Sequence, residues 1–191
     1  RASSGHSPPA WRIAENGCIC DLGGWTGRGS SRRPWRRGTA PSSMPEPALE
    51  TVHGRVLMVS SHDAAHPGEN VTDGTDETYW ISTGLYPQEI LLDLVDLVRL
   101  GIVKLTTTHV RDLRVEVCRE SPPVNFTTAV SKRFDDKQGC LQITELRCGD
   151  DVGPIQYVKV LIMSGWCEFC SVHQIQLMGE VAEKLVRRRS A

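Results

Sequence analysis

Apolar residues after position 55 recur at every second position or gather in short runs, and no stretch shows the three- and four-residue spacing of an amphipathic helix. The alternation is clearest in residues 113–117 and again in residues 158–160, where apolar and charged residues take turns. We expect the odd positions of 113–117 to face a core and the even positions to face water. This period of two predicts strands with one buried face, and so an all-β domain.

The individual strands follow from the same pattern. We predict them at residues 55–60, 88–93, 99–108, 113–119, 126–133, 141–146, 157–164 and 172–178. Turn-forming residues such as Asp73-Gly74 and Gly153-Pro154 separate them. Parallel strands would need crossover helices, which this sequence does not offer. The expected fold is therefore an antiparallel β-sandwich of the jelly-roll type.

Composition divides the chain into three parts. Residues 1–50 are rich in Gly, Ser, Pro and Arg and have no apolar period, so we expect a disordered basic extension. Residues 51–180 form the predicted jelly-roll domain, and residues 181–191 form a charged C-terminal tail. Met44 is the first methionine of the chain, and our hypothesis is that residues 1–43 lie upstream of the natural start.

Charge is distributed unevenly along the chain. The formal net charge is -1, but the first 45 residues hold seven Arg against Glu15 and Asp21, so the remainder is acidic. An acidic domain has no basic face to grip phosphates, and we expect no nucleic-acid binding by the folded part. Two interpretations stay open for the stretch RRPWRRG at residues 32–38: an interaction tail for nucleic acid or an acidic surface, or an ordinary part of a disordered extension.

The sequence pattern predicts neither membrane insertion nor secretion. It holds no run of about 18 apolar residues that could span a bilayer, and no secretory signal pattern. We therefore expect the seven cysteines to be reduced thiols, and the protein to lie in the cytosol or a compartment continuous with it.

Residues 60–89 are too rich in turn-formers and aromatic residues to be an ordinary strand. Within them, Asn70, Asp73, Thr75 and Thr78 offer side-chain and backbone oxygens in one short arc, and Gly74 allows a sharp turn. Calcium takes about six to eight oxygen ligands of these kinds. The arc is therefore a candidate calcium site, although the same residue types also satisfy the backbone of a plain turn and the pattern is not an EF-hand.

The same segment carries a family motif. Its members are Ser60-Ser61, His66-Pro67, Glu69-Asn70, Asp73-Gly74, Glu77-Thr78, Trp80, Thr83-Gly84 and Pro87-Gln88-Glu89, with Ser171-Val172-His173 and Gly179 near the C-terminus. This arrangement resembles the intraflagellar transport protein 25 family, which also carries a small heat-shock label, over residues 55–179. The core of the motif is shared more widely with galactose-binding-like jelly rolls. We see no pattern that would support a chaperone role.

The resemblance implies a jelly roll whose first long loop binds one calcium ion. By position in the motif, the implied ligands are Asn70, Asp73 and Thr78, with Thr75 contributing its backbone. It also implies pairing with a Rab-like small GTPase, intraflagellar transport protein 27, within the B complex that carries cargo along cilia, and a link to Hedgehog signalling. The expected location is the cilium or flagellum and the cytoplasm.

One feature departs from the wider pattern of these jelly rolls. Related domains often add a Glu ligand from the final strand, whereas the corresponding position here is Met178, with Gln176 and Glu180 nearby. This departure puts full coordination of calcium in doubt.

Cys167 and Cys170 have the spacing of a zinc or redox motif. A structural zinc needs further ligands, for which Cys148 and His173 are the candidates; buried thiols near a strand are the other interpretation. His66 and His173 could act as acid and base, but no nucleophile elbow or paired carboxylates accompany them, so we expect no enzyme activity. We expect His66 to fix the loop and His173 to hydrogen-bond within the closing strand.

A second function class stays open. Other jelly rolls with this loop pattern bind carbohydrates or lipid headgroups, using exposed aromatic and basic residues at the loop tips. Tyr86 and Arg111 are candidate tip residues here, but aromatic residues make up only 6% of the chain and few stacking platforms remain beyond Trp80 and Trp166. We expect Trp80 itself to anchor the core, because a buried aromatic ring of that size removes a large apolar area from water.

Overall fold

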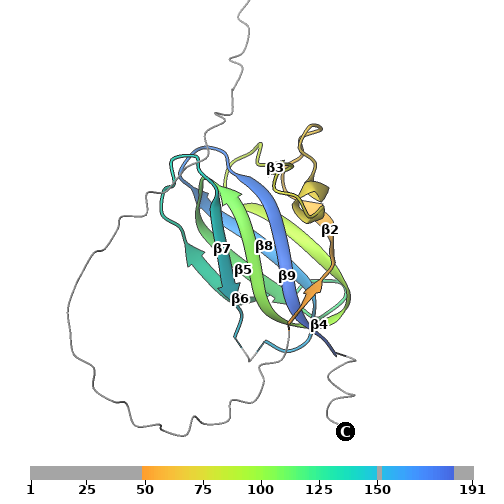
Figure 1. The fold of residues 1–191 in the computed structure, drawn as a ribbon. Helices are drawn as coiled ribbons and strands as arrows, with labels where there is room; N and C mark the ends of the chain where they lie inside the picture. Colours follow the sequence, from red (N-terminus) through yellow and green to blue (C-terminus); the bar gives the residue numbers. More distant parts are fainter. Residues whose placement is uncertain (1–48, 150–151, 183–191) are drawn as a thin grey trace, which may run out of the picture. The chain divides into compact units, whose positions relative to one another are not determined.

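The computed structural model of the chain describes residues 49–149 and 152–182 (Figure 1). The predictions for the N-terminal extension up to residue 48, for Met44 as a start and for the tail beyond residue 182 lie outside these residues. Within the described part of the chain, no helix is long and apolar enough to cross a membrane.

Strands make up nearly all the regular structure of the described residues. They are β1 (Glu50–Val52), β2 (Gly54–Val59), β3 (Trp80–Ile81), β4 (Gln88–Thr108), β5 (Val110–Cys118), β6 (Thr127–Arg133), β7 (Gln142–Arg147), β8 (Ile155–Gly165) and β9 (Ser171–Val181). A short 3-10 helix, η1 (Gly68–Thr72), lies between β2 and β3. Every strand pair is antiparallel. The prediction of an all-β antiparallel fold is confirmed.

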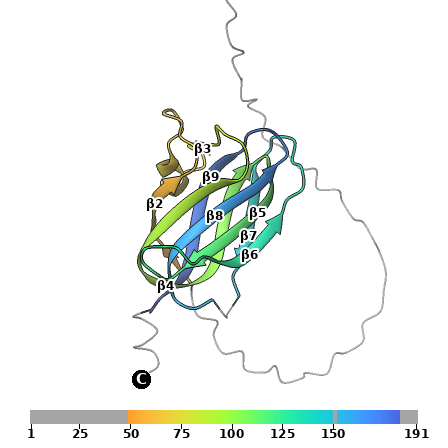
Figure 2. The ribbon, with the colours of Figure 1, turned by 180° about the vertical axis from the view of Figure 1, so that it is seen from behind.

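The strands form two layers that share β4 (Figures 1 and 2). The first half of β4 pairs with β2 and with β8, and β8 continues through β5 to β6. Its second half pairs with β7 on one side and with β9 on the other, and β1 and β3 pair with the far edge of β9. A register shift between Asp93 and Val98 separates the two halves. The result is the predicted sandwich.

The continuity of β4 differs from the sequence prediction, which placed separate strands at 88–93 and 99–108. Val95 and Asp96 are both exposed, so the period of two fails where the strand leaves one layer and enters the other. The backbone stays extended through that point even though the side-chain pattern does not. β1 and β3 escaped prediction because three and two residues are too few to show any period.

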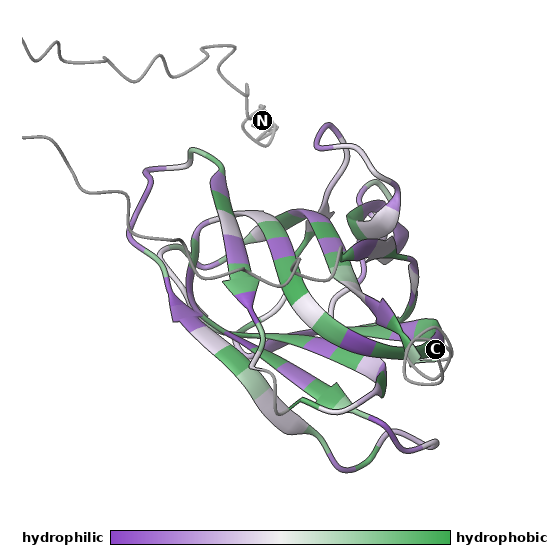
Figure 3. Cartoon of the chain, turned by 60° about the horizontal axis from the view of Figure 1, so that its bottom comes forward, coloured by the Kyte–Doolittle hydropathy of each residue, from purple (hydrophilic) through white to green (hydrophobic). Residues whose placement is uncertain are grey.

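The core lies between the layers and takes side chains from both. Leu113, Val115 and Val117 are buried, whereas Arg114 between them is exposed, which confirms the predicted alternation. The other face of the same layer is mixed. Lys159 of β8 lies 2.7 Å from Glu116 of β5, and Leu91, Cys118 and Tyr157 form a second, smaller apolar cluster beside this pair. Figure 3 shows the hydrophobic and hydrophilic bands alternating along the strands.

Candidate functional site

The long segment between β2 and β4 packs into the core and does not lie only on the surface of the sandwich. Trp80 and Val71 are fully buried, and the Trp80 indole N–H donates a hydrogen bond to the carbonyl of Ser61 at 2.9 Å. Gly68 packs so closely on β2 that a Cβ there would lie 2.7 Å from Cγ1 of Val59. The prediction that Trp80 anchors the core is confirmed, and the loop around it has a defined base.

Asp73 is the centre of the predicted ligand arc. Its Oδ1 accepts a hydrogen bond from the backbone N–H of Thr75 at 3.0 Å, and its Oδ2 accepts one from the Thr78 hydroxyl at 2.5 Å. Gly74 has a φ of 89°, a left-handed conformation that suits glycine, and the space where its Cβ would lie is open. The structure therefore brings together three of the four predicted ligand residues.

The fourth predicted ligand, Asn70, lies in η1, before the other three in the chain. Its side-chain amide nitrogen donates to the carbonyl of Tyr79 at 2.9 Å. Because the nitrogen is used in that bond, the amide oxygen is the Asn70 atom that can coordinate a cation. The Thr75 hydroxyl accepts a hydrogen bond from the Glu77 N–H at 3.1 Å, so the side chain of Thr75 supports the turn itself.

The donor types of this arc fit a hard cation. Asp73 supplies a carboxylate, and Asn70 and Thr78 supply neutral oxygens, which are the ligands that calcium prefers. The described residues contain no cluster of three or more His, Cys, Asp or Glu side chains that could hold a metal ion. A calcium ion here would therefore rely on one carboxylate together with amide, hydroxyl and backbone oxygens.

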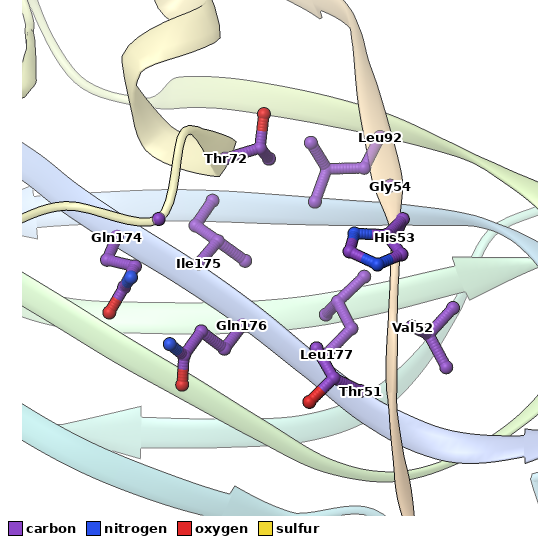
Figure 4. A pocket seen from close by; sticks show the side chains of 11 residues that line it. Thr51, Val52, His53, Gly54, Thr72, Leu92, Gln174, Ile175, Gln176 and Leu177 are labelled. Atoms are coloured by element: carbon purple, nitrogen blue, oxygen red, sulfur yellow. The ribbon is translucent and has the colours of Figure 1, made fainter.

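A small hollow of about 120 Å³ lies beside the arc, between η1, β9 and the start of β2 (Figure 4). Gly74 and Thr72 line it on the loop side, and Gln174 and Gln176 project from β9. Met178 pairs with Ile102 and Thr51 further along the ladder. The amides of Gln174 and Gln176, rather than a residue at 178, are therefore the polar groups that the closing strand presents here.

Two histidines and a tyrosine fasten the arc to the closing strand. His173 lies with Nδ1 2.9 Å from the carbonyl oxygen of Asp76 and with Nε2 3.0 Å from the Ser171 hydroxyl. The ring of Tyr79 stacks on His66, with 4.1 Å between centroids, and its other neighbour is the ring of His173 at 5.0 Å. The expected roles of both histidines are confirmed. The role of Tyr79 could not be predicted, because its ring partners His66 and His173 are distant in the chain.

A second and larger hollow, of about 810 Å³, lies between residues 82–86 and 164–169. Leu85, Trp166 and Phe169 line it with exposed apolar side chains. Both residues predicted at the loop tips contact other residues of the protein. The Tyr86 hydroxyl donates a hydrogen bond to the carbonyl of Cys167 at 3.2 Å, and the Arg111 guanidinium lies 5.1 Å from the centre of the Trp166 ring. Burial raises the pKa of Tyr86 well above its ordinary value, so its hydroxyl stays protonated.

The cysteines of the described residues are free thiols. Cys170 is buried, with its thiol 3.7 Å from the Ser82 hydroxyl, and Cys167 is exposed. Burial raises the pKa of the Cys148 thiol from 9.0 to about 11. The zinc interpretation finds no ligand cluster among residues 49–149 and 152–182, and His173 is already bonded to Asp76 and Ser171.

Comparison with known proteins identifies one family. Over 137 residues the chain is 31% identical to the human intraflagellar transport protein 25 homolog, and this match covers 72% of this chain and 94% of the human protein. The chain belongs to the intraflagellar transport protein 25 family. The Chlamydomonas reinhardtii member is also 31% identical, over 140 residues that cover 71% of this chain and 70% of the algal protein. No family model matches the sequence.

The solved structures that share this family's fold include sugar-binding modules. The family 32 carbohydrate-binding module of Clostridium perfringens NanJ, in complex with galactose, superposes with a TM-score of 0.58 at 12% identity and covers 69% of this chain and 99% of that module. A chitosan-binding module of a Paenibacillus chitosanase/glucanase gives 0.56 at 21% identity, covering 66% of this chain and 95% of the module. At these identities the likeness establishes the galactose-binding-like jelly roll and nothing about ligands.

Proposed function

We propose that this chain is a non-catalytic subunit of the intraflagellar transport B complex, located in the cilium or flagellum and the cytoplasm. Its sandwich pairs with a Rab-like small GTPase, intraflagellar transport protein 27, and supports the transport of ciliary cargo that includes Hedgehog signalling components. One observation carries the proposal: the match extends over nearly the full length of a human protein named for intraflagellar transport.

The surface of the sandwich is compatible with a protein partner. Among the described strands β7 pairs only with β4, so it forms one edge of its layer, and its Ile143 is 73% exposed. Leu57 and Met58 of β2 add exposed apolar side chains on the other layer. An edge strand has one row of backbone groups without a strand partner, and a second protein can dock on such an edge.

Co-purification from ciliated cells tests the proposal. The full chain, carrying an affinity tag, should recover the small GTPase and further B-complex subunits, identified by mass spectrometry. A tagged carbohydrate-binding module of the same jelly-roll fold is the matched control, because it reproduces the architecture without the sequence of this family. Recovery of no transport subunit above that control would contradict the proposal.

Calcium, in this proposal, is a structural ligand of the arc at Asn70, Asp73, Thr75 and Thr78. When bound, the ion would offset the charge of Asp73 and link the neutral oxygens around it. The residues of the chain already hold the arc: Asp73 accepts from Thr75 and Thr78, and Asn70 is tied to Tyr79. A cation bound only by the folded state would stabilise the domain through mass action.

A second candidate is a calcium-dependent module for carbohydrate or lipid headgroups. The observation that favours it is the hollow lined by Leu85, Trp166 and Phe169, on a fold shared with sugar-binding modules. A glycan array and vesicles containing anionic lipids would decide between the candidates. Specific micromolar binding that is lost in Trp166→Ala would favour the second candidate, and a blank array would leave the transport subunit as the better account.

A further inference from the structure

The loop between β8 and β9 holds two cysteines that differ sharply in their surroundings. Cys167 lies on the exposed part of the loop, and Cys170 is fully buried directly before β9 begins. The backbone bends at residues 166, 167 and 168, between the end of β8 and the buried Cys170. A spacing of two residues across such a bend is short enough for the two thiols to be joined by a disulfide.

Cys167 has a partner that can take its proton. Its sulfur lies 3.3 Å from Nδ1 of His109, the residue that connects β4 to β5. His109 is fixed in place: its φ is 58°, its carbonyl accepts the Trp166 N–H at 2.8 Å, and its ring meets the edge of the Phe169 ring at 5.8 Å. An imidazole at this distance from a thiol is the arrangement that generates a nucleophilic thiolate.

Cys170 is placed as the second thiol. Its backbone N–H donates to the Ser82 hydroxyl at 2.9 Å, which fixes its position at the base of the loop. The Tyr86 hydroxyl interacts with the Cys170 thiol and donates to the Cys167 carbonyl at 3.2 Å, so both cysteines adjoin one oxygen atom. Burial raises the pKa of Cys170, which keeps this thiol protonated and leaves the first attack to Cys167.

We propose that Cys167 and Cys170 form a reversible dithiol–disulfide centre, with Cys167 as the attacking thiol, His109 as its base and Cys170 as the resolving thiol. The oxidant is a small-molecule disulfide such as oxidised glutathione.

The exchange proceeds in two balanced steps. His109 accepts the thiol proton, and the Cys167 thiolate attacks one sulfur of the small disulfide. A mixed disulfide forms, and the other half leaves as a thiolate that takes the proton from His109. Cys170 then attacks the Cys167 sulfur, and the proton that Cys170 gives up passes to the departing half of the small disulfide, which leaves as a thiol. Two protein thiols are thereby oxidised by two electrons, and the small disulfide is reduced to two thiols.

Peptide mapping tests the centre directly. The full chain is equilibrated in glutathione buffers of increasing oxidised fraction, quenched with an alkylating reagent and digested with trypsin. Residues 160–184 contain no Lys or Arg before their last residue, so one peptide carries Cys167 and Cys170 and no other cysteine. We expect this peptide to lose two hydrogens and become resistant to alkylation as the buffer is oxidised. A peptide that stays fully alkylated, or carries only separate glutathione adducts, would overturn the proposal.

Two variants assign the roles. Cys170→Ser should trap the mixed disulfide on Cys167, and Cys170→Ala repeats the test if the serine variant folds poorly. His109→Asn removes the base at a left-handed position that Asn tolerates, and should slow formation of the mixed disulfide by about tenfold, because an unassisted thiol is only a few per cent thiolate near neutral pH. Cys140→Ser is the control and should leave the mapped disulfide unchanged. An unchanged rate in His109→Asn would remove His109 from the mechanism.

Discussion

Asp73 is the one carboxylate among the predicted calcium ligands, and its two oxygens also organise the turn around them. We expect calcium to raise the melting temperature of the protein, with a gain of about 2.7 kcal/mol in the free energy of unfolding at a hundredfold excess over Kd. Asp73→Ala should lower the melting temperature in calcium and abolish the calcium dependence. Differential scanning calorimetry with calcium or a chelator measures both effects.

The matched control for that measurement is Asp63→Ala. The Asp63 carboxylate accepts hydrogen bonds from the backbone N–H groups of Ala65 and His66, so its loss also removes a carboxylate-stabilised turn from the same loop. Asp63→Ala should lower the melting temperature but retain the calcium-dependent shift. If Asp73→Ala keeps the shift as well, Asp73 is not a ligand.

Trp80 contributes both packing and one buried hydrogen bond. Trp80→Phe leaves the Ser61 carbonyl without its indole partner and opens a small cavity, so we expect a loss of about 2–4 kcal/mol in the free energy of unfolding. Urea denaturation followed by circular dichroism measures it. Trp166→Phe makes a fair comparison, because that indole also donates to a carbonyl, of Phe134 at 3.2 Å, but is 39% exposed. Its cost should be below about 1 kcal/mol; equal costs would argue against burial as the cause.

At the level of single residues, the sequence predicted what local rules decide. The alternation around Leu113 and the burial of Trp80 follow from period and size, and both predictions are confirmed. The role of Tyr79 and the bond from His173 to Asp76 could not be predicted, since the latter joins residues 97 apart. Such contacts depend on where β9 lies relative to the loop in the folded protein. The residue pattern of a single sequence does not show that position.

Substitution of Gly68, the first residue of η1, tests how closely the loop packs on the sheet. Gly68→Ala would place a methyl group 2.7 Å from Cγ1 of Val59, so we expect a loss of about 1–3 kcal/mol in the free energy of unfolding. Adding Val59→Ala should return part of that loss, because it removes the clashing carbon. Gly153→Ala, at a position with open space around it, should cost little. Additive effects of Gly68→Ala and Val59→Ala would show that the two residues do not compete for the same volume.

Strand lengths were harder to predict than strand positions. The expected breaks at the end of 88–93 and before 99–108 reflected a real change, since β4 passes from one layer to the other there. Near Val95 and Asp96 the side chains that face the core change, but the backbone remains a strand. The prediction was wrong because it took this change in burial for the end of a strand. Hydrophobic periodicity reports the environment of side chains, and it reports the backbone only where the environment is constant.

At the scale of the whole molecule, buried thiols should lower the free energy of unfolding as the pH rises into the alkaline range. The pKa of Cys148 is about 11 in the folded protein against 9.0 for a free thiol, so the folded state keeps a proton that the unfolded chain releases. The stabilisation is complete below pH 9 and is lost as the pH rises through 11, and the raised pKa of Cys170 acts in the same direction. Urea denaturation across this range should show falling stability, and Cys148→Ala should flatten the slope. An unchanged slope would exclude Cys148 as a source.

Because β4 belongs to both layers, we expect the two layers to open together. Detaching β8 from β4 and detaching β9 from β4 are disturbances of a single continuous strand, which spans residues Gln88–Thr108. Amide hydrogens in the two layers should therefore exchange with deuterated solvent in one concerted opening, with a common free energy, rather than layer by layer.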